Sequence, residues 1–280
     1  MEYNQEISNS EKLTYSTIRI ETTYSNGSSG SGTGFIMNFC TLPSGEAIPC
    51  LVTNSHVIEG AVQGRIILSY HTGDEHFDDS RHQGVVIPNF QSGWIKHPDE
   101  SVDLCILQLT NLFEQLANAG KVPLYSPMSL SAIPSQDQIN TLSAMEDIVM
   151  IGYPNGLWDS YNNKPLIRKG ITATHIKKDY LNKKEFVIDA ACFPGSSGSP
   201  VFLLNEGSYY SNGKLYSGNR TYLIGILYAG PRISVHGEIE VEDIPTAQSG
   251  TSVSQHMINL GYVIKSERLH AFESILLKML

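Results

Sequence analysis

Short apolar or alternating stretches, separated by glycine, proline, serine and asparagine, follow one another along most of the 280-residue chain. Residues 15–24 are the clearest case, because they alternate and are rich in threonine and isoleucine, which predicts a half-buried strand. Comparable runs predict strands at 34–38, 48–54, 64–70, 84–88, 102–109, 147–153, 170–176, 186–190, 200–204, 222–227 and 260–264. This pattern indicates a turn-rich β protein.

Helical patterns are few. Residues 111–119 have helical character that ends at Gly120, and His56 begins a short helical turn over 57–61. The last segment, 267–280, is amphipathic, and Ser266 is placed to cap it. Its apolar face either docks on the protein's own sheet, the commoner fate of such helices, or packs against a partner. That face consists of Leu269, Phe272, Ile275, Leu276 and Met279.

Composition and charge narrow the possible partners. The chain is 41% hydrophobic, enough for one large or two small domains, and its formal net charge is −9. Nucleic acids and anionic membranes both need clustered lysine and arginine, so neither is expected as a partner. No run approaches the length of a membrane helix, and residues 1–6 lack the basic region that opens a signal peptide. A cytoplasmic location is therefore expected.

Four cysteines, Cys40, Cys50, Cys105 and Cys192, are too few for a disulfide scaffold. We interpret them as reduced core residues, as is usual in the cytosol. Cys40 and Cys50 flank a predicted hairpin and could face each other, so a pairing between these two stays open.

One segment carries the chemistry of a nucleophile. Residues 193–201 place Ser197 between glycines at a sharp turn, directly before an apolar strand. Glycine lets backbone N–H groups approach a reacting carbonyl and stabilise its negative charge. A serine needs a base, and the base needs a group that orients it. His56 and Asp103 lie upstream in strand-like surroundings and are the candidates for these two roles.

The residues around Ser197 resemble a known family. Gly195, Ser197, Gly198 and Pro200 match the G-x-S-G-x-P motif of trypsin-like peptidases. The order His, Asp, Ser is that of chymotrypsin-like proteases, and differs from the orders in α/β-hydrolases and subtilisins. The chain is most similar to bacterial HtrA-type peptidases, through the segments 32–36, 188–191, 223–230 and 259–264.

This resemblance implies an all-β fold of two six-stranded antiparallel β-barrels, chymotrypsin-like, with a short C-terminal α-helix. The first barrel is expected to carry His56 and Asp103, and the second to carry Ser197. The expected boundaries are 1–122 for the N-terminal barrel, 123–145 for a linker between the barrels, 146–265 for the C-terminal barrel and 266–280 for the helix.

The resemblance also implies a serine endopeptidase that forms an acyl-enzyme and needs no cofactor. Ser197 would attack, although Ser196 and Ser199 are rivals in the same loop. His56 would take the serine proton, and Asp103 would hold the imidazole in the productive tautomer. The backbone N–H groups of Gly195 and Ser197 would form the oxyanion hole.

Substrate recognition follows in the same way from the resemblance. Tyr228, Ala229 and Gly230 would pair with an extended peptide as an added strand. Ala191 would form the floor of the first specificity pocket, with Phe193 near its entrance. Gly261 matches a wall glycine. A pocket with these residues is neutral and is expected to take small or medium apolar side chains rather than lysine or arginine.

Regulation is expected to differ from that of secreted trypsins. Ser196 stands where an aspartate would pair with a newly cut N-terminus, so trypsin-style activation is not expected. The chain leaves no room for a PDZ domain after residue 265, and activation by a protein partner or a substrate is one alternative. Residues 231–256 read as a long irregular insertion with an acidic patch at 238–243, either a gate over the cleft or a solvated loop.

Other functions stay open at this point. The chain could be a catalytically silent regulator or binding module with a protease fold, or an esterase-like hydrolase. A role as an effector in a bacterial stress or defence system is suggested by the resemblance alone. The glycine-rich loop 26–32 lacks the lysine of a phosphate-binding loop. No metal site is expected either. One loop mixes histidine with aspartate and glutamate, but the spacing of these residues fits no compact set of metal ligands. They are His71, Asp74, Glu75, His76, Asp78, Asp79 and His82.

Overall fold

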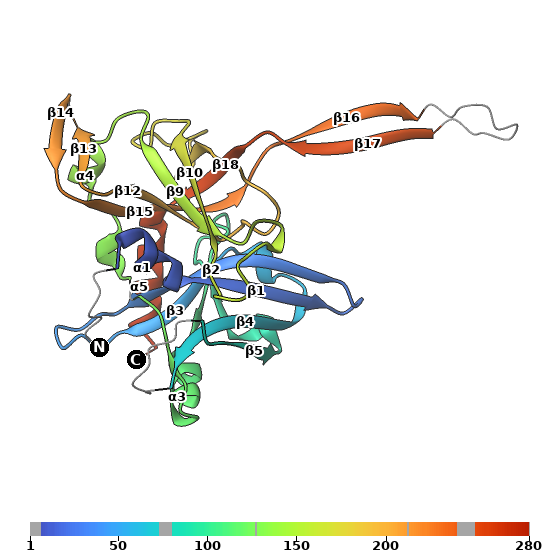
Figure 1. Ribbon diagram of the computed structural model, residues 1–280, viewed down its shortest axis with the longest axis vertical. Helices are drawn as coiled ribbons and strands as arrows, with labels where there is room; N and C mark the ends of the chain where they lie inside the picture. Colours follow the sequence, from blue (N-terminus) through green and yellow to red (C-terminus); the bar gives the residue numbers. More distant parts are fainter. Residues whose placement is uncertain (1–6, 73–79, 127, 212, 240–249, 280) are drawn as a thin grey trace, which may run out of the picture.

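Two β-sheet bodies lie one above the other, as Figure 1 shows, with the blue and cyan N-terminal strands below and the yellow to red C-terminal strands above. The computed structural model describes residues 7–72, 80–126, 128–211, 213–239 and 250–279. This architecture confirms the predicted all-β, chymotrypsin-like fold with a short C-terminal helix. The domain boundaries at 122, 145 and 265 stay a prediction.

The N-terminal body is a single antiparallel sheet of eight strands in the order β5-β4-β1-β2-β3-β7-β6, with β8 paired to β4. It forms a half-barrel, where the sequence predicted a closed six-stranded barrel. Its interior is lined by buried residues such as Ile20, Leu51 and Phe90. The strands are β1 Thr17–Tyr24, β2 Ser29–Phe39, β3 Ile48–Thr53, β4 Ala61–His71, β5 His82–Pro88, β6 Trp94–Lys96, β7 Cys105–Gln108 and β8 Val122–Pro123.

The C-terminal body is a closed six-stranded barrel in the order β10-β11-β18-β15-β12-β9. Its strands are β9 Asp147–Gly152, β10 Leu166–Thr172, β11 Glu185–Asp189, β12 Pro200–Asn205, β15 Arg220–Ala229 and β18 Leu260–Lys265. A separate hairpin, β13 Ser208–Ser211 with β14 Lys214–Ser217, projects from it. One apolar cluster joins the two bodies, because Phe35 and Val52 of the first pack together with Ile151 and Phe202 of the second.

The helices are short and lie around the sheets. They are α1 Asn9–Ser16, α2 Ser55–Ile58, α3 Thr110–Asn118, α4 Gln136–Asn140 and α5 His270–Leu276, with the 3₁₀ turns η1 Phe90–Gly93, η2 Leu130–Ala132, η3 Pro154–Gly156 and η4 Ser266–Leu269. The sequence did not predict α1, which begins where the Ser8 side chain accepts a hydrogen bond from the Glu11 N–H. No described helix is long and apolar enough to span a membrane.

The C-terminal helix docks on the protein itself, which answers the question that the sequence left open. Leu269, Phe272 and Leu276 are fully buried, and the Phe272 ring meets the edge of Phe39 at a centroid distance of 6.3 Å. Met279, by contrast, is exposed. The prediction that Ser266 caps this helix is wrong, because Ser266 opens the 3₁₀ turn η4, and α5 begins after Leu269 without a side-chain cap.

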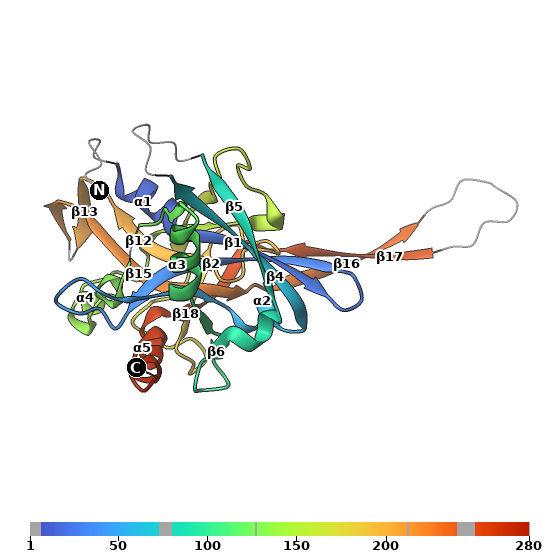
Figure 2. The same cartoon turned by 90° about the horizontal axis from the view of Figure 1, so that it is seen from below.

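The described parts of the insertion at 231–256, residues 231–239 and 250–256, are not irregular, and for them that prediction is wrong. They form the antiparallel strands β16 Arg232–Ile239 and β17 Gly250–Met257, which leave the body as a long two-stranded ribbon (Figures 1 and 2). Isoleucine and valine alternate with polar residues at 233–236, and this pattern predicts a strand. The prediction of a loop gave more weight to the length of the insertion. Most of the acidic patch, like most of the residues weighed as metal ligands, lies outside the described residues.

A buried ion pair in the C-terminal barrel links the residue before β9 to the first residue of β15. Arg220 Nη2 lies 2.7 Å from Glu146 Oε2, with side-chain exposures of 5% and 7%. We expect Glu146→Gln to lower the free energy of unfolding by about 3–5 kcal/mol, because it leaves a buried guanidinium uncompensated. Urea denaturation measures this change.

The neighbouring residue provides a control. Asp147 pairs with Lys169 at 2.8 Å, but both side chains are more than half exposed. We expect Asp147→Asn to cost less than about 1 kcal/mol. Equal losses in the two variants would contradict the assignment of stability to the buried pair.

Candidate active site

The turn that carries His56 is clamped to the segment that carries Asp103. Strand β3 ends at Thr53, and the next residue, Asn54, donates from Nδ2 to the Asp103 carbonyl at 2.8 Å. Ser55 Oγ donates to the Leu104 carbonyl at 3.1 Å. These bonds bring two segments that lie nearly 50 residues apart in the chain into one fixed geometry.

Both oxygens of the Asp103 carboxylate face His56. Oδ2 lies 2.5 Å from the imidazole Nδ1, and Oδ1 accepts the backbone N–H of His56 at 3.0 Å. Because a carboxylate only accepts hydrogen bonds, this contact places a proton on Nδ1 and leaves Nε2 with a free lone pair. The His56 side chain is 44% exposed, so a substrate can reach the imidazole.

Ser197 lies directly before strand β12 of the C-terminal barrel, and in the described part of the chain no hydrogen bond joins its side chain to His56. Its Oγ donates to the Tyr228 carbonyl at 3.4 Å, and its own carbonyl accepts the Thr33 N–H at 2.9 Å. Burial, the hydrogen bond to Glu185 and nearby charges, that of Asp103 among them, raise the pKa of Tyr228. Tyr228 therefore has Ser197 against its backbone and the Asp103 charge near its side chain.

The loop before Ser197 holds Gly195 in the left-handed region, at φ +87°. The Pro194 carbonyl accepts the Asn155 N–H at 2.5 Å, and the Gly195 carbonyl accepts from Thr33 Oγ1 at 2.9 Å. In a trans peptide the N–H points opposite to the carbonyl, so the Gly195 N–H is turned away from Asn155. Within the described part of the chain, neither it nor the Ser197 N–H donates to a backbone carbonyl. Two N–H groups of this loop thus have no backbone acceptor among the described residues.

We expect Gly195→Ala to lower kcat about 10²–10³-fold, the effect of losing one oxyanion donor. An added Cβ would lie 2.6 Å from the Tyr153 carbonyl and would strain a left-handed residue, so the loop must shift. Steady-state kinetics on a peptide substrate measure the effect. Gly207→Ala is the matched control, because Gly207 has φ +86° with nothing within 4 Å of an added Cβ. A similar fall in kcat for both variants would sink the prediction.

Thr33 on β2 links the two bodies at this loop, and sequence reasoning missed its role. Its Oγ1 donates to the Gly195 carbonyl and accepts the Tyr153 N–H at 3.0 Å, while its carbonyl accepts from Thr53 Oγ1 at 2.6 Å. The segment 32–36 was noticed only as a strand motif, and nothing in the sequence pointed to these partners. Asn155, in η3, was missed for the same reason.

Thr33→Val should lower kcat about tenfold to a hundredfold and leave KM nearly unchanged. It removes the hydroxyl that orients the Gly195 peptide and leaves the buried Tyr153 N–H unpaired. The test is the separate measurement of kcat and KM. Thr33→Ser keeps the hydroxyl and should restore most of the activity, whereas a serine variant as slow as the valine variant would argue against a positioning role.

The expected substrate-binding residues lie close to this centre. Ala229 is exposed at the end of β15, with Tyr228 and Gly230 partly exposed beside it. Gly261 is buried, and a Cβ there would lie 2.6 Å from both Cys192 Sγ and Leu227 Cδ1, so packing alone already requires glycine at this position.

A charge that the sequence did not reveal lies beside the expected specificity pocket. Arg168 Nη1 donates to the Ala191 carbonyl at 2.8 Å, and its guanidinium lies 4.9 Å from the centre of the Phe193 ring. A guanidinium so close to Ala191 repels a second positive charge brought to the same place.

All four cysteines are buried and free, as the sequence predicted, and Cys40 and Cys50 form no disulfide. Burial raises the pKa of the Cys50 thiol to about 12 and that of Cys192 to about 11, and it raises the pKa of Cys105 and Cys40 as well. A thiol is nucleophilic only as the thiolate. None of the four is therefore suited to attack a substrate near neutral pH.

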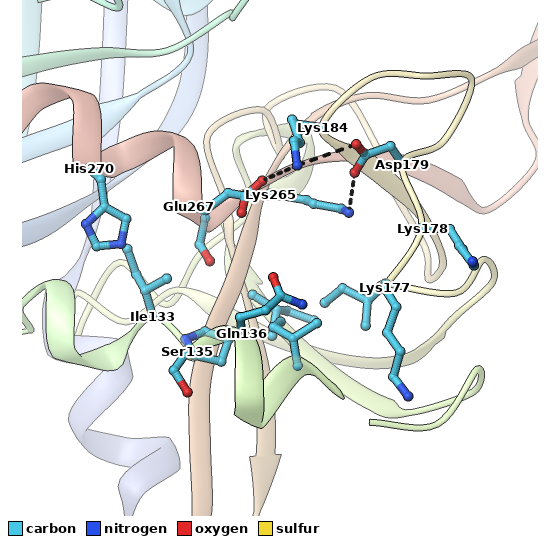
Figure 3. A pocket seen from close by; sticks show the side chains of 15 residues that line it. Ile133, Ser135, Gln136, Lys177, Lys178, Asp179, Lys184, Lys265, Glu267 and His270 are labelled. Atoms are coloured by element: carbon cyan, nitrogen blue, oxygen red, sulfur yellow. Dashed lines mark hydrogen bonds and ion pairs between the residues drawn. The ribbon is translucent and has the colours of Figure 1, made fainter. Parts of the chain in front are cut away.

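A separate pocket of about 420 Å³ lies beside the loop between β10 and β11 (Figure 3). Lys265 Nζ binds Asp179 at 2.6 Å, and Lys184 Nζ lies 3.2 Å from Glu267 and 3.5 Å from Asp179. These ion pairs tie the loop to η4 and to the end of β18. The loop leads into Glu185, which accepts the Tyr228 hydroxyl at 2.9 Å. Through Glu185, the loop beside this pocket contacts Tyr228 of β15. None of His56, Asp103 and Ser197 lines the pocket.

The family model described as a trypsin-like peptidase domain matches residues 32–209, a stretch that contains His56, Asp103 and Ser197. The chain belongs to the trypsin-like peptidase family. The resemblance to trypsin-like peptidases stated from the sequence is thereby confirmed. No curated protein matches the chain.

Solved structures resemble this trypsin-like chain over most of its length. The HtrA-type protease AlgW with a tripeptide is 20% identical, with a TM-score of 0.49. The matched region includes 95% of this chain and 61% of the AlgW chain. Protease Anisep from Arthrobacter nicotinovorans is 13% identical, with a TM-score of 0.48 and coverages of 94% and 96%. The Rv3671c protease from M. tuberculosis is 14% identical, with a TM-score of 0.44 and coverages of 93% and 80%. The chain thus spans about three fifths of the length of AlgW.

Proposed function

We propose that this trypsin-like chain is a serine endopeptidase with a His56-Asp103-Ser197 triad. The observation that carries the proposal is the pair of contacts from the Asp103 carboxylate to His56, which engage Nδ1 and leave Nε2 without a partner in the described part of the chain, on a side chain that is 44% exposed. Ser197 supports it through its place beside Tyr228, together with the two N–H groups available in the same loop.

The reaction proceeds by acyl transfer in two halves. His56 Nε2 takes the Ser197 Oγ proton as Oγ bonds to the scissile carbonyl carbon, whose oxygen becomes negative and is bound by the Gly195 and Ser197 N–H groups. The protonated imidazole then gives its proton to the departing amine as the C–N bond breaks. Water, deprotonated by the same nitrogen, attacks the acyl-enzyme, and Oγ leaves with a proton returned by His56. Asp103 stabilises the imidazolium and stays ionised throughout.

Substrate binding in this proposal uses the exposed end of β15. An extended peptide pairs with Tyr228, Ala229 and Gly230, and its side chain at the cleaved residue enters the space by Ala191, Phe193 and Gly261. With Arg168 beside Ala191, we expect apolar residues to be preferred and basic ones rejected. A cleavage profile of a peptide library dominated by lysine or arginine would overturn this specificity.

A fluorophosphonate probe tests the proposal directly. It should label the wild-type protein stoichiometrically at Ser197, and Ser197→Ala should abolish both the label and the cleavage of peptides. Iodoacetamide should leave activity intact at pH 7.5, because the thiols of the native protein are buried and protonated. An absence of labelling would favour a silent regulator, and hydrolysis of activated esters without any peptide cleavage would favour an esterase.

Location and regulation complete the proposal. Free, buried cysteines support a reducing compartment, and we place the protein in the cytoplasm. The orientation of the Gly195 peptide supports an oxyanion hole that forms without a newly cut N-terminus. Control by a protein partner or loop rearrangement, in a bacterial stress or defence system, is tested by mapping new protein N-termini in cells that express the wild type against Ser197→Ala.

A further inference from the structure

We propose that the outer edge of β16 binds the part of the substrate chain that precedes the scissile bond. The preferred substrates are then long unstructured polypeptides rather than short peptides or loops of folded proteins. This inference rests on the proposed peptidase function and names its substrate class.

Strand β15 has one open edge at its C-terminal end. Strand β15 pairs with β12 on one side only as far as Ile226, which lies opposite Pro200. On its other side it continues to pair with β18 up to Ala229, which lies opposite Tyr262. The Leu227 N–H and C=O still bond on this side, to the Ser199 carbonyl and the Gly198 N–H, which lie directly before β12. Beyond Leu227, therefore, the edge that faced β12 has no partner among the described strands.

The ribbon of β16 and β17 continues this arrangement. Only two residues separate Ala229 from Arg232, where β16 begins, and two separate Met257, where β17 ends, from β18. Arg232 lies opposite Met257, so the antiparallel pairing of β15 with β18 passes into that of β16 with β17. Since β17 and β18 lie on the same side throughout, the open edge of β15 and that of β16 form one continuous edge. Figures 1 and 2 show the ribbon extending from the barrel at this point.

The chemistry of this edge specifies its ligand. Among the described strands, β16 pairs with β17 alone. The N–H and C=O groups on the edge of β16 that faces away from β17 therefore bond to no other strand. An isolated two-stranded ribbon is only marginally stable, and a third strand added by a ligand would stabilise it. The eight residues of β16 extend about 27 Å at 3.4 Å per residue. An unfolded segment supplies that length of free backbone without giving up a fold of its own.

The direction of the substrate follows from antiparallel pairing, the arrangement of every strand pair in this protein's ladders. A scissile carbonyl at Ser197 lies beside Tyr228, so an antiparallel substrate places its preceding residues along Ala229, Gly230 and then β16. Main-chain bonds supply the affinity, so sequence preference along β16 should be weak.

The test uses peptides that share one cleavable core. Extending the core from four to twelve residues before the scissile bond should lower KM at least tenfold with little change in kcat. An equal extension after the bond should have little effect. Backbone N-methylation, moved one residue at a time beyond the fourth position, should weaken cleavage at every second residue, because alternate residues of an added strand face its partner.

A shortened ribbon isolates the contribution of β16. Ser234 lies opposite Gln255, so joining them through Asn-Gly removes 235–254 and retains a hairpin turn. This variant should cleave the four-residue core within twofold of wild type and lose the advantage of longer peptides. Joining Tyr209 to Tyr216 in the β13–β14 hairpin by the same turn is the matched control and should retain that advantage.

The outcomes separate the inference from the function beneath it. If short peptides are cleaved in a Ser197-dependent way but length has no effect, or the shortened ribbon keeps the length effect, the inference is wrong and the peptidase stands. If neither short nor long peptides are cleaved and the fluorophosphonate does not react, the proposed function itself fails.

Discussion

Replacing Ser197 with alanine should lower kcat for peptide hydrolysis about 10⁶-fold, because the attacking oxygen is lost and only binding and the oxyanion hole remain. The measurement is single-turnover hydrolysis of a fluorogenic peptide at saturating enzyme. Thermal unfolding should be nearly unchanged, since within the described residues Ser197 Oγ makes a single, long hydrogen bond, at 3.4 Å, to the Tyr228 carbonyl.

Two further variants make this result decisive. Ser196 is the adjacent serine; its hydroxyl is buried and has no hydrogen-bond partner in the described part of the chain. Ser196→Ala should therefore keep activity close to wild type. Ser197→Ala combined with His56→Ala should be scarcely slower than either single variant, because triad residues act as a unit. Additive losses, or an equal loss in Ser196→Ala, would remove Ser197 from the role of nucleophile.

Asp103→Asn should lower kcat about 10⁴-fold with a small change in KM. In the wild type, Asp103 Oδ1 accepts the His56 backbone N–H and Oδ2 lies 2.5 Å from Nδ1. If the oxygen of the substituted asparagine keeps the first contact, its NH₂ group replaces Oδ2 and faces Nδ1. The amide donates to Nδ1, so the imidazole proton moves to Nε2, and the nitrogen that should receive the serine proton no longer accepts one. Steady-state kinetics at neutral pH measure the fall.

The control for Asp103 lies at the same turn. Asn54 Nδ2 donates to the backbone carbonyl of Asp103, and Asn54→Ala removes that clamp without touching the carboxylate. We expect it to destabilise the fold measurably, since a buried hydrogen bond is lost, and to lower kcat far less than Asp103→Asn. If the two variants lost activity equally, Asp103 would be a structural residue and not the partner of the imidazole.

Much of the site was visible in the sequence because its signals are local. Ser197 stands between glycines that a sharp turn requires, and His56 and Asp103 each lie at the margin of an apolar run. Strand patterns of period two likewise predicted most of the barrel strands. The ribbon of β16 and β17 was misread, although its residues alternate, because a long insertion with acidic residues suggested a loop.

The partners of the site residues could not be read in the same way. Thr33 and Gly195 are separated by 162 positions, and Asn155 reaches Pro194 from another loop. Arg168 lies beside Ala191 only because β10 and the end of β11 are neighbours in a closed barrel. None of these contacts leaves a trace in the pattern of either segment alone.

By itself, then, the amino-acid sequence determined the chemical groups available for catalysis and the strands that carry them, since both depend on residue type and on spacing within a few positions. The tertiary structure alone decided how the Gly195 peptide is oriented, which charge lies beside Ala191 and where the unpaired edge of β16 extends. The physical reason is that strand register and barrel closure depend on contacts between distant segments, and these contacts set the direction of every N–H and side chain at the site.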